Sequence, residues 1–163
     1  MIMIIVVMGV CSSGKTVIGS LLAERLGLEF YDADNFHPES NIRKMSKGIS
    51  LNDKDRLPWL KSIAEKMPQW AKGSGAVLAC SALKNSYRDI LRVGSSDVRF
   101  VYLKGTKEII LERIRNRKGH FFPASLVDSQ FEIIDEPEDA IVIDITQKPE
   151  VIVEEIVNKL NKG

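Results

Sequence analysis

The 163-residue chain is 44% hydrophobic, which suits one ordinary globular domain and excludes a disordered chain. Its 23 basic and 22 acidic residues leave a formal net charge of +1, so the composition favours neither a nucleic-acid partner nor a membrane surface. The apolar N-terminus spans about seven residues, too few for a signal peptide or a membrane span, and we therefore expect a cytoplasmic protein.

A buried strand is predicted over residues 2–8, which form a continuous run of apolar side chains. Residues 9–16, Gly-Val-Cys-Ser-Ser-Gly-Lys-Thr, match the phosphate-binding pattern G-x-x-x-x-G-K-[ST]. Beyond them, Ile18, Leu22 and Leu26 recur at helical spacing. The motif therefore lies between a strand and a helix, the context that distinguishes a nucleotide-binding loop from a chance glycine turn.

The chemistry of this loop favours a polyphosphate ligand. Its backbone N–H groups and the positive end of the helix dipole form an anion site, to which Lys15 adds a full charge. The hydroxyl of Thr16 is suited to binding Mg²⁺ beside the phosphates. We expect contacts to ATP from the loop and from the residue after it: Gly9, Cys11, Ser12, Ser13, Gly14, Lys15, Thr16 and Val17.

Two carboxylates follow the second predicted strand, over residues 28–31. In open parallel sheets the residues just beyond the carboxyl end of a strand line the ligand crevice. On an extended backbone Asp32 and Asp34 would point the same way, one toward a metal and the other toward a substrate. A structural alternative is that Asp34 caps a helix beginning near Asn35. Beside a phosphate loop we favour the functional interpretation, with Asp32 as the second Mg²⁺ partner of Thr16.

The region over about residues 35–60 begins with polar residues that resemble a small substrate-facing insertion more than a core element. His37 has either a structural or a catalytic role here. Asn52 is predicted to cap a helix that Pro58 bends or restarts. Arg56 either forms weak surface ion pairs or binds a substrate carboxylate through its planar guanidinium.

Three more strands are predicted, over residues 76–80, 99–103 and 140–145, each followed by a segment with helical spacing. Five buried strands that alternate with helices predict an α/β fold, a three-layer α/β/α sandwich around a five-stranded parallel sheet. We expect a single domain over residues 1–163. The two cysteines, Cys11 and Cys80, fit neither a disulfide framework nor a zinc site, which indicates reduced thiols.

A basic segment follows the fourth predicted strand and its helix. Four cations fall in the six residues from Arg113 to Lys118, and Gly119, His120 and Pro123 come directly after them. Such a segment is either a solvated helix end, with cations near the negative end of the dipole, or a lid whose arginines close over phosphates. Because phosphoryl transfer must exclude water, we favour a lid over about residues 115–125.

Several blocks of the sequence resemble the gluconokinase family. They are Tyr31-Asp32-Ala33-Asp34-Asn35-Phe36-His37-Pro38, Asp53-x-Asp55-Arg56-x-Pro58-Trp59-Leu60, Cys80-Ser81-Ala82-Leu83-Lys84-x-x-Tyr87-Arg88, Lys118-Gly119-His120-Phe121-Phe122 and Asp128-Ser129-Gln130-Phe131. Together they are far more specific than the phosphate loop alone. The resemblance implies a P-loop kinase, similar in fold to shikimate and nucleoside-monophosphate kinases, that uses ATP and Mg²⁺ to phosphorylate the terminal hydroxyl of D-gluconate. It also implies a homodimer.

The resemblance further implies roles for individual residues. Asp34 would accept the proton of the substrate hydroxyl, as a base or an orienting group, and Arg117 would join Lys15 at the transferring phosphate. Arg113 would stack on adenine, beside a base-binding loop that includes Gln147. Candidates for the hydroxyls and carboxylate of gluconate are His37, Lys44, Arg56, Ser81, Lys84, Arg88 and His120.

The phosphate loop departs from the family pattern at Cys11 and Ser12, which replace Ser and Gly. If the backbone of Ser12 has positive φ, its side chain costs about 1 kcal/mol or more relative to glycine. Three alternatives to a gluconokinase stay open. They are a kinase of another small hydroxy acid such as shikimate, a nucleoside-monophosphate kinase, and a nucleotide-binding module without catalytic activity.

Overall fold

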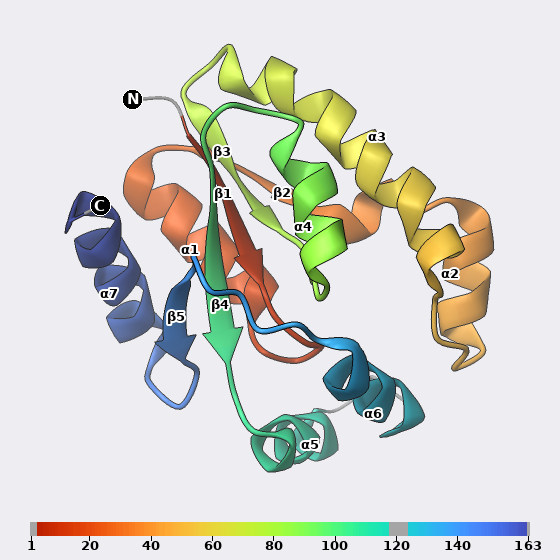
Figure 1. Ribbon diagram of the computed structural model, residues 1–163. Coiled ribbons are helices and arrows are strands. Elements are labelled where there is room, and N and C mark those ends of the chain that lie inside the picture. The colour runs from red at the N-terminus through yellow and green to blue at the C-terminus, as the bar shows by residue number, and fades with distance from the viewer. Residues whose placement is uncertain (1–2, 118–123, 163) are drawn as a thin grey trace.

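The protein is described by a computed structural model that covers residues 3–117 and 124–162. A five-stranded sheet forms its centre, with the strand order β2-β3-β1-β4-β5 (Figure 1). All neighbouring strands run parallel. The strands are β1 (Met3–Met8), β2 (Glu29–Asp32), β3 (Gly75–Ala79), β4 (Val98–Lys104) and β5 (Ile141–Asp144). The predicted α/β class and its five parallel strands are confirmed.

Helices cover both faces of the sheet, as Figure 1 shows. They are α1 (Lys15–Leu26), the 3₁₀ helix η1 (Ala33–Phe36), α2 (Glu39–Ser46), α3 (Asp53–Ala71), α4 (Asn85–Arg92), α5 (Lys107–Asn116), α6 (Ala124–Ile133) and α7 (Pro149–Lys162). One face of the sheet packs against α1 and α7, and the other packs against α3 and α4. The three layers are those of the predicted sandwich.

The central strand β1 explains why its sequence is apolar without alternation. Ile5 and Val7 point to the cluster beneath α1 and α7, whereas Ile4, Val6 and Met8 point to the cluster beneath α3. All five side chains are fully buried. A strand with a helix layer on each face needs apolar residues at every position, because both of its faces are core.

The register of the strands brings functional segments to one edge of the sheet. Val7 of β1 and Asp32 of β2 both pair with Ala79 of β3, so the three strands end side by side. The N–H of Gly9 donates to the carbonyl of Ser81 at 3.3 Å, which ties the two loops that leave β1 and β3. This edge is where an open parallel sheet binds its ligand.

The structure defines the helices after β2 more closely than the sequence pattern does. Asn52 caps α3 as predicted, in a capping box with Asp55, and of the two alternatives at Pro58 a restart is excluded, because the helix continues to Ala71. Burial of apolar residues such as Leu60 holds it together where the proline lacks an N–H donor. The polar stretch after His37 also forms a regular helix, α2. Within the described part of the chain, no helix has both the length and the apolar character that crossing a membrane requires.

Candidate active site

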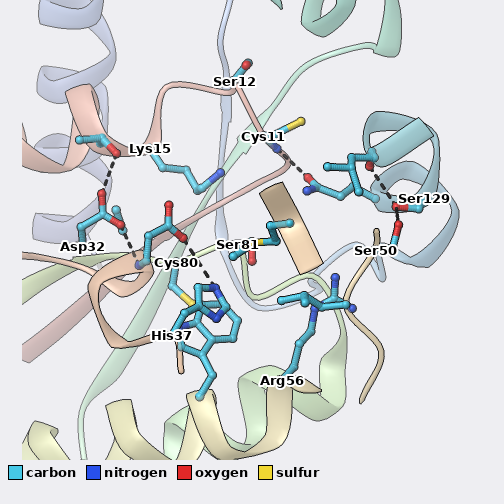
Figure 2. A pocket seen from close by; sticks show the side chains of 18 of the residues that line it. Cys11, Ser12, Lys15, Asp32, His37, Ser50, Arg56, Cys80, Ser81 and Ser129 are labelled. Atoms are coloured by element: carbon cyan, nitrogen blue, oxygen red, sulfur yellow. Dashed lines mark hydrogen bonds and ion pairs between the residues drawn. The ribbon is translucent and has the colours of Figure 1, made fainter. Parts of the chain in front are cut away.

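A cavity of about 380 Å³ opens at the carboxyl ends of β1, β2 and β3. Its walls come from the phosphate loop, from η1, from the segment between α2 and α3, and from α6. Figure 2 shows labelled side chains around one space, among them Cys11 of the phosphate loop, His37 directly after η1, Ser50 between α2 and α3, and Ser129 of α6. The structure brings twelve of the predicted site residues to this cavity: Cys11, Ser12, Gly14, Lys15, Thr16, Val17, Asp32, Asp34, His37, Arg56, Ser81 and Arg117.

The phosphate loop has the backbone of an anion site. Gly14 precedes α1 with φ of 98°, and no side chain caps the helix, so its first N–H groups stay available to a ligand. Position 9 favours glycine for two reasons, its φ of 152° and the lack of room for a side chain. A Cβ there would lie 2.9 Å from the carbonyl oxygen of Leu103 and 2.7 Å from Oγ of Ser13.

Ser12 has φ of 60°, the left-handed conformation that favours glycine. Two arginines from successive turns of the α5 region approach it. Nη1 of Arg113 donates to the carbonyl of Ser12 at 3.2 Å, and Nη1 of Arg117 donates to its hydroxyl at 3.4 Å. Arg113 also donates to the carbonyl of Ile145 at 2.7 Å. The side chain at this unusual position is therefore in contact with the predicted lid arginine.

Lys15 is held at the centre of the loop (Figure 2). Its Nζ donates to the carbonyl of Val10 at 2.8 Å. Burial lowers the pKa of Lys15, and the neighbouring Cys11 and Asp34 partly oppose this effect. A half-buried ammonium group at the mouth of an anion site attracts a phosphate oxygen more strongly than an exposed one does, because less water competes for it.

Asp32 and Thr16, the two predicted Mg²⁺ ligands, are hydrogen-bonded to each other. Oγ1 of Thr16 donates to Oδ2 of Asp32 at 3.1 Å, and Oδ1 of Asp32 accepts the N–H of Asp34 at 3.0 Å. The carboxylate that caps the following helix is thus Asp32, and the less favoured alternative of a cap at Asp34 is excluded. The chain turns into η1 directly after Asp32, so the condition under which the two carboxylates would point the same way, an extended backbone, is not met.

The oxygen donors of this pair fit Mg²⁺, which prefers hard ligands and keeps several waters. Among the described residues, no cluster of three His, Cys, Asp or Glu side chains could enclose a metal ion. A site with one hydroxyl and one carboxylate matches a cation that takes its other ligands from phosphates and water.

Asp34 projects from η1 into the cavity with its side chain 82% exposed. The enclosing protein atoms and the carboxylate of Asp32 raise the pKa of Asp34, and Lys15 opposes them. Nε2 of His37 lies 3.9 Å from Oδ1 of Asp34. Asp34 is therefore a carboxylate with a raised proton affinity, open to a ligand on one side and close to an imidazole on the other.

His37 is a neutral, fixed ring. It stacks on Trp59 with ring centres 4.1 Å apart, and its Nδ1 lies 3.2 Å from the amide nitrogen of Asn41. Burial and the charge of Arg56 lower the pKa of His37 to about 4. Because the amide of Asn41 donates to Nδ1, the ring proton lies on Nε2, the nitrogen nearer to Asp34. The contact with Asp34 is therefore between a neutral donor and a carboxylate.

Three predicted substrate ligands do not line the cavity. Lys44 donates to Asp55 at 2.8 Å, and Lys84 donates to Asp53 at 3.0 Å. Arg88 is only 1% exposed and donates to the main-chain carbonyls of Ala82 at 2.6 Å and of Asp135 at 2.8 Å. Its guanidinium joins the loop after β3 to the segment after α6, which is a structural role.

The remaining predicted residues are placed around the loop or outside the structure. Gly9 and Ser13 shape the phosphate loop from behind the cavity wall. Gln147 donates to the carbonyl of Asp144 and to Glu155, both at 3.1 Å. His120 and most of the predicted lid lie outside the described residues.

Sequence reasoning missed the contribution of α6. Oε1 of Gln130 accepts the N–H of Cys11 at 2.7 Å, and the hydroxyl of Ser129 is hydrogen-bonded to that of Ser50 at 2.8 Å. All four residues line the cavity. The block Asp128-Ser129-Gln130-Phe131 signalled this helix through the family resemblance, but its partner residues could not be read from spacing, because they lie far away in the chain.

The fold and cavity together define a P-loop kinase for a small acceptor molecule. The family model described as shikimate kinase matches residues 11–161. A solved shikimate kinase from Aquifex aeolicus has the same fold, with a TM-score of 0.61 over 98% of this chain and 97% of its own length at 22% identity.

More similar proteins are gluconokinases. A probable gluconokinase of Xenopus tropicalis is 47% identical over 98% of this chain and 94% of its own length. The crystal structure of a gluconokinase from Sinorhizobium meliloti 1021 is 42% identical, with a TM-score of 0.90 over 98% of this chain and 92% of that one. The chain belongs to the gluconokinase family, and the resemblance seen in its sequence blocks is confirmed.

Proposed function

We propose that the protein transfers the γ-phosphoryl group of ATP to the terminal hydroxyl of D-gluconate and forms 6-phospho-D-gluconate. One observation supports this most strongly: a single cavity contains both a phosphate loop and the pair Asp34 and Arg56. The first element suits a nucleotide, and the second suits a hydroxy acid. The gluconokinases that resemble the chain over nearly its whole length supply the substrate class.

The nucleotide side uses the loop and α1. N–H groups at the start of α1 would bind phosphate oxygens, with Lys15 as the cation nearest to them. Thr16 and Asp32 would hold Mg²⁺, which when bound neutralises charge on the phosphates. Arg113 and Gln147 would contact the adenine, as the family resemblance implies. Arg113 and Arg117 both donate to Ser12 of the loop, Arg117 from the end of α5.

The acceptor side uses Asp34, His37 and Arg56. The guanidinium of Arg56 would bind the carboxylate of gluconate, for which its paired N–H groups are suited. The terminal hydroxyl would then lie at Asp34. Its oxygen attacks the γ-phosphorus in line, the bond to the β,γ-bridging oxygen breaks, ADP leaves, and the hydroxyl proton passes to Asp34. Neutral His37 can donate Nε2–H to a hydroxyl or to Asp34 and so orient it.

We also propose a domain organisation, an oligomeric state and a cellular compartment. We infer a single domain with a substrate-binding insertion over about residues 35–60 and a lid over about residues 115–125. Arg117 stands at the start of that lid and lines the cavity, which supports it. Family resemblance supports a homodimer, and the two free cysteines, Cys11 and Cys80, suit a reducing cytoplasm.

A panel of acceptors tests the proposal. ADP release from ATP and Mg²⁺ is followed with gluconate, shikimate, AMP or no acceptor, for the native protein and for Lys15→Ala. We expect release only with gluconate, and none from Lys15→Ala although it remains folded. Shikimate is the second candidate, because the matching family model carries that name. Activity on shikimate or AMP alone would replace the proposed substrate, and binding of ATP without any acceptor-dependent release would indicate a non-catalytic module.

A further inference from the structure

Tyr87 lies beside Arg56 and has no role in the chemistry described above. Its side chain is 4% exposed and belongs to α4, whereas Arg56 lies near the start of α3. Nη1 of Arg56 donates to the hydroxyl of Tyr87 at 2.9 Å, and the guanidinium carbon lies 5.4 Å from the centre of the tyrosine ring. Both the hydroxyl and the ring of Tyr87 therefore contact this arginine.

The direction of these hydrogen bonds is fixed by chemistry. The hydroxyl of Tyr87 lies 2.6 Å from Oδ1 of Asp53, which also accepts from Nζ of Lys84 at 3.0 Å. A carboxylate only accepts and a guanidinium only donates, so the phenol proton points to Asp53 and a lone pair points to Arg56. Hydrogen bonds from Tyr87 and Lys84 lower the pKa of Asp53, which keeps this acceptor ionised. The chain of contacts thus has one stable arrangement.

Arg56 is the end of this chain that reaches the cavity. It lines the cavity together with Asp34, and its charge lowers the pKa of His37, so it lies on the acceptor side. A carboxylate accepts two parallel N–H hydrogen bonds from a guanidinium when the plane of the guanidinium is fixed in the right orientation. Fixing the plane before the ligand arrives also reduces the side-chain entropy lost on binding. The buried hydroxyl of Tyr87 is the contact that holds it.

We propose that Tyr87 is a positioning residue that orients Arg56 for the carboxylate of the acceptor. It thereby determines the preference for a hydroxy acid over a neutral polyol of the same length. The inference rests on the proposed function, which supplies the acceptor class. Lys84 and Asp53 lie far apart in the sequence and do not line the cavity, and they act on the acceptor through Tyr87.

Tyr87→Phe tests the proposal, because it keeps the ring and removes only the hydroxyl. D-gluconate and D-glucitol, which has a hydroxymethyl group in place of the carboxylate, are compared as acceptors for the full-length protein. We expect KM for gluconate to rise roughly tenfold, with kcat within about twofold of the native value and KM for ATP unchanged. kcat/KM for glucitol stays unchanged, so the selectivity ratio falls roughly tenfold. Competitive inhibition constants replace kcat/KM if turnover of glucitol is too slow.

Two further variants separate positioning from a general loss of structure. Tyr102→Phe removes the hydroxyl of another buried tyrosine, on β4 and outside the cavity. It should leave kcat/KM unchanged for both gluconate and glucitol. Asp53→Ala changes a side chain that is 66% exposed and should shift selectivity in the same direction as Tyr87→Phe, by a smaller factor. In an Arg56→Ala background, Tyr87→Phe should have no further effect on gluconate.

The outcomes decide between the inference and the function on which it rests. Equal losses for gluconate and glucitol, unchanged selectivity, or effects of Arg56→Ala and Tyr87→Phe that simply add would each overturn the role of Tyr87. Those results leave the proposed function intact. If the native protein neither binds nor phosphorylates gluconate, the proposed function fails and the role of Tyr87 fails with it.

Discussion

The hydroxyl of Thr16 donates to a carboxylate oxygen of Asp32 across 3.1 Å, which joins the first turn of α1 to the end of β2. The other oxygen of Asp32 accepts the N–H of Asp34 at 3.0 Å. One side chain therefore links the proposed Mg²⁺ ligand to the proposed base. The metal side and the acceptor side of the cavity share this carboxylate, so a substitution of Asp32 should affect both Mg²⁺ binding and the orientation of Asp34.

Asp32→Asn should weaken the response to Mg²⁺. The amide keeps the size and one acceptor oxygen but removes the negative charge beside Thr16. We expect the free Mg²⁺ concentration for half-maximal velocity to rise about tenfold at saturating ATP and gluconate. Asp139→Asn, at an exposed carboxylate paired with Arg92, serves as the matched control. An unchanged Mg²⁺ dependence in Asp32→Asn would remove Asp32 from the metal site.

Asp34→Asn should lower kcat by about 10²–10⁴ while ATP still binds, because the variant lacks the proton acceptor. In the native protein, the enclosing atoms and Asp32 raise the pKa of Asp34. As pH falls through that pKa, Asp34 becomes protonated and kcat/KM declines, so the acid limb of kcat/KM should lie at higher pH than for an ordinary aspartate. A profile of kcat/KM for gluconate against pH measures this limb. Finding the same limb in Asp34→Asn would assign it to another group.

His37 should make stability depend on pH. Its pKa is about 4 in the folded protein and about 6.5 in the unfolded chain. Between these values the unfolded chain binds a proton that the folded protein does not, so the free energy of unfolding falls as pH decreases from about 6.5 to about 4. The contribution of His37 is up to roughly 3 kcal/mol. The free energy of unfolding, measured with urea at several pH values across this range, should depend less steeply on pH for His37→Gln than for the native protein. An equally steep dependence on pH in both proteins would show that His37 titrates normally.

Ser12→Gly should stabilise the protein without ligand. The left-handed φ of 60° suits glycine, and the hydrogen bond lost with Arg117 is long, at 3.4 Å. We expect the free energy of unfolding to rise by about 0.5–1 kcal/mol. Ser12→Ala is the control, because it loses the hydroxyl but keeps the Cβ atom that causes the strain. A gain of the same size in Ser12→Ala would mean that the hydroxyl, not the backbone, is unfavourable.

The sheet and the phosphate loop could be predicted because their signals are local. The unbroken apolar run of β1 and the pattern from Gly9 to Thr16 depend only on neighbouring residues, and Ile4 to Met8 are buried as such a run requires. The residue that caps η1 was less open to prediction. Whether Asp32 or Asp34 is the cap depends on where the chain turns after β2, which residue types alone do not determine.

The parts of the site that were missed depend on distant contacts. Arg88 follows a strand end as a ligand would, but the carbonyl of Asp135, from a remote segment, draws its guanidinium into the core. The hydrogen bond from Cys11 to Gln130 spans 119 positions in the chain. Only the path of the chain through α5 and α6 brings these two residues together, and no spacing pattern carries that information.

The chemical identity of the product tests the central claim most directly. ATP, Mg²⁺ and D-gluconate are incubated with the native protein, and the phosphorylated product is examined by proton-coupled phosphorus NMR. The account predicts one ester formed in equal amount with ADP, its phosphorus coupled to the two protons of the terminal CH₂ group, and no ester with Lys15→Ala. A phosphorus coupled to a single CH proton, or ADP release that does not require gluconate, would contradict it.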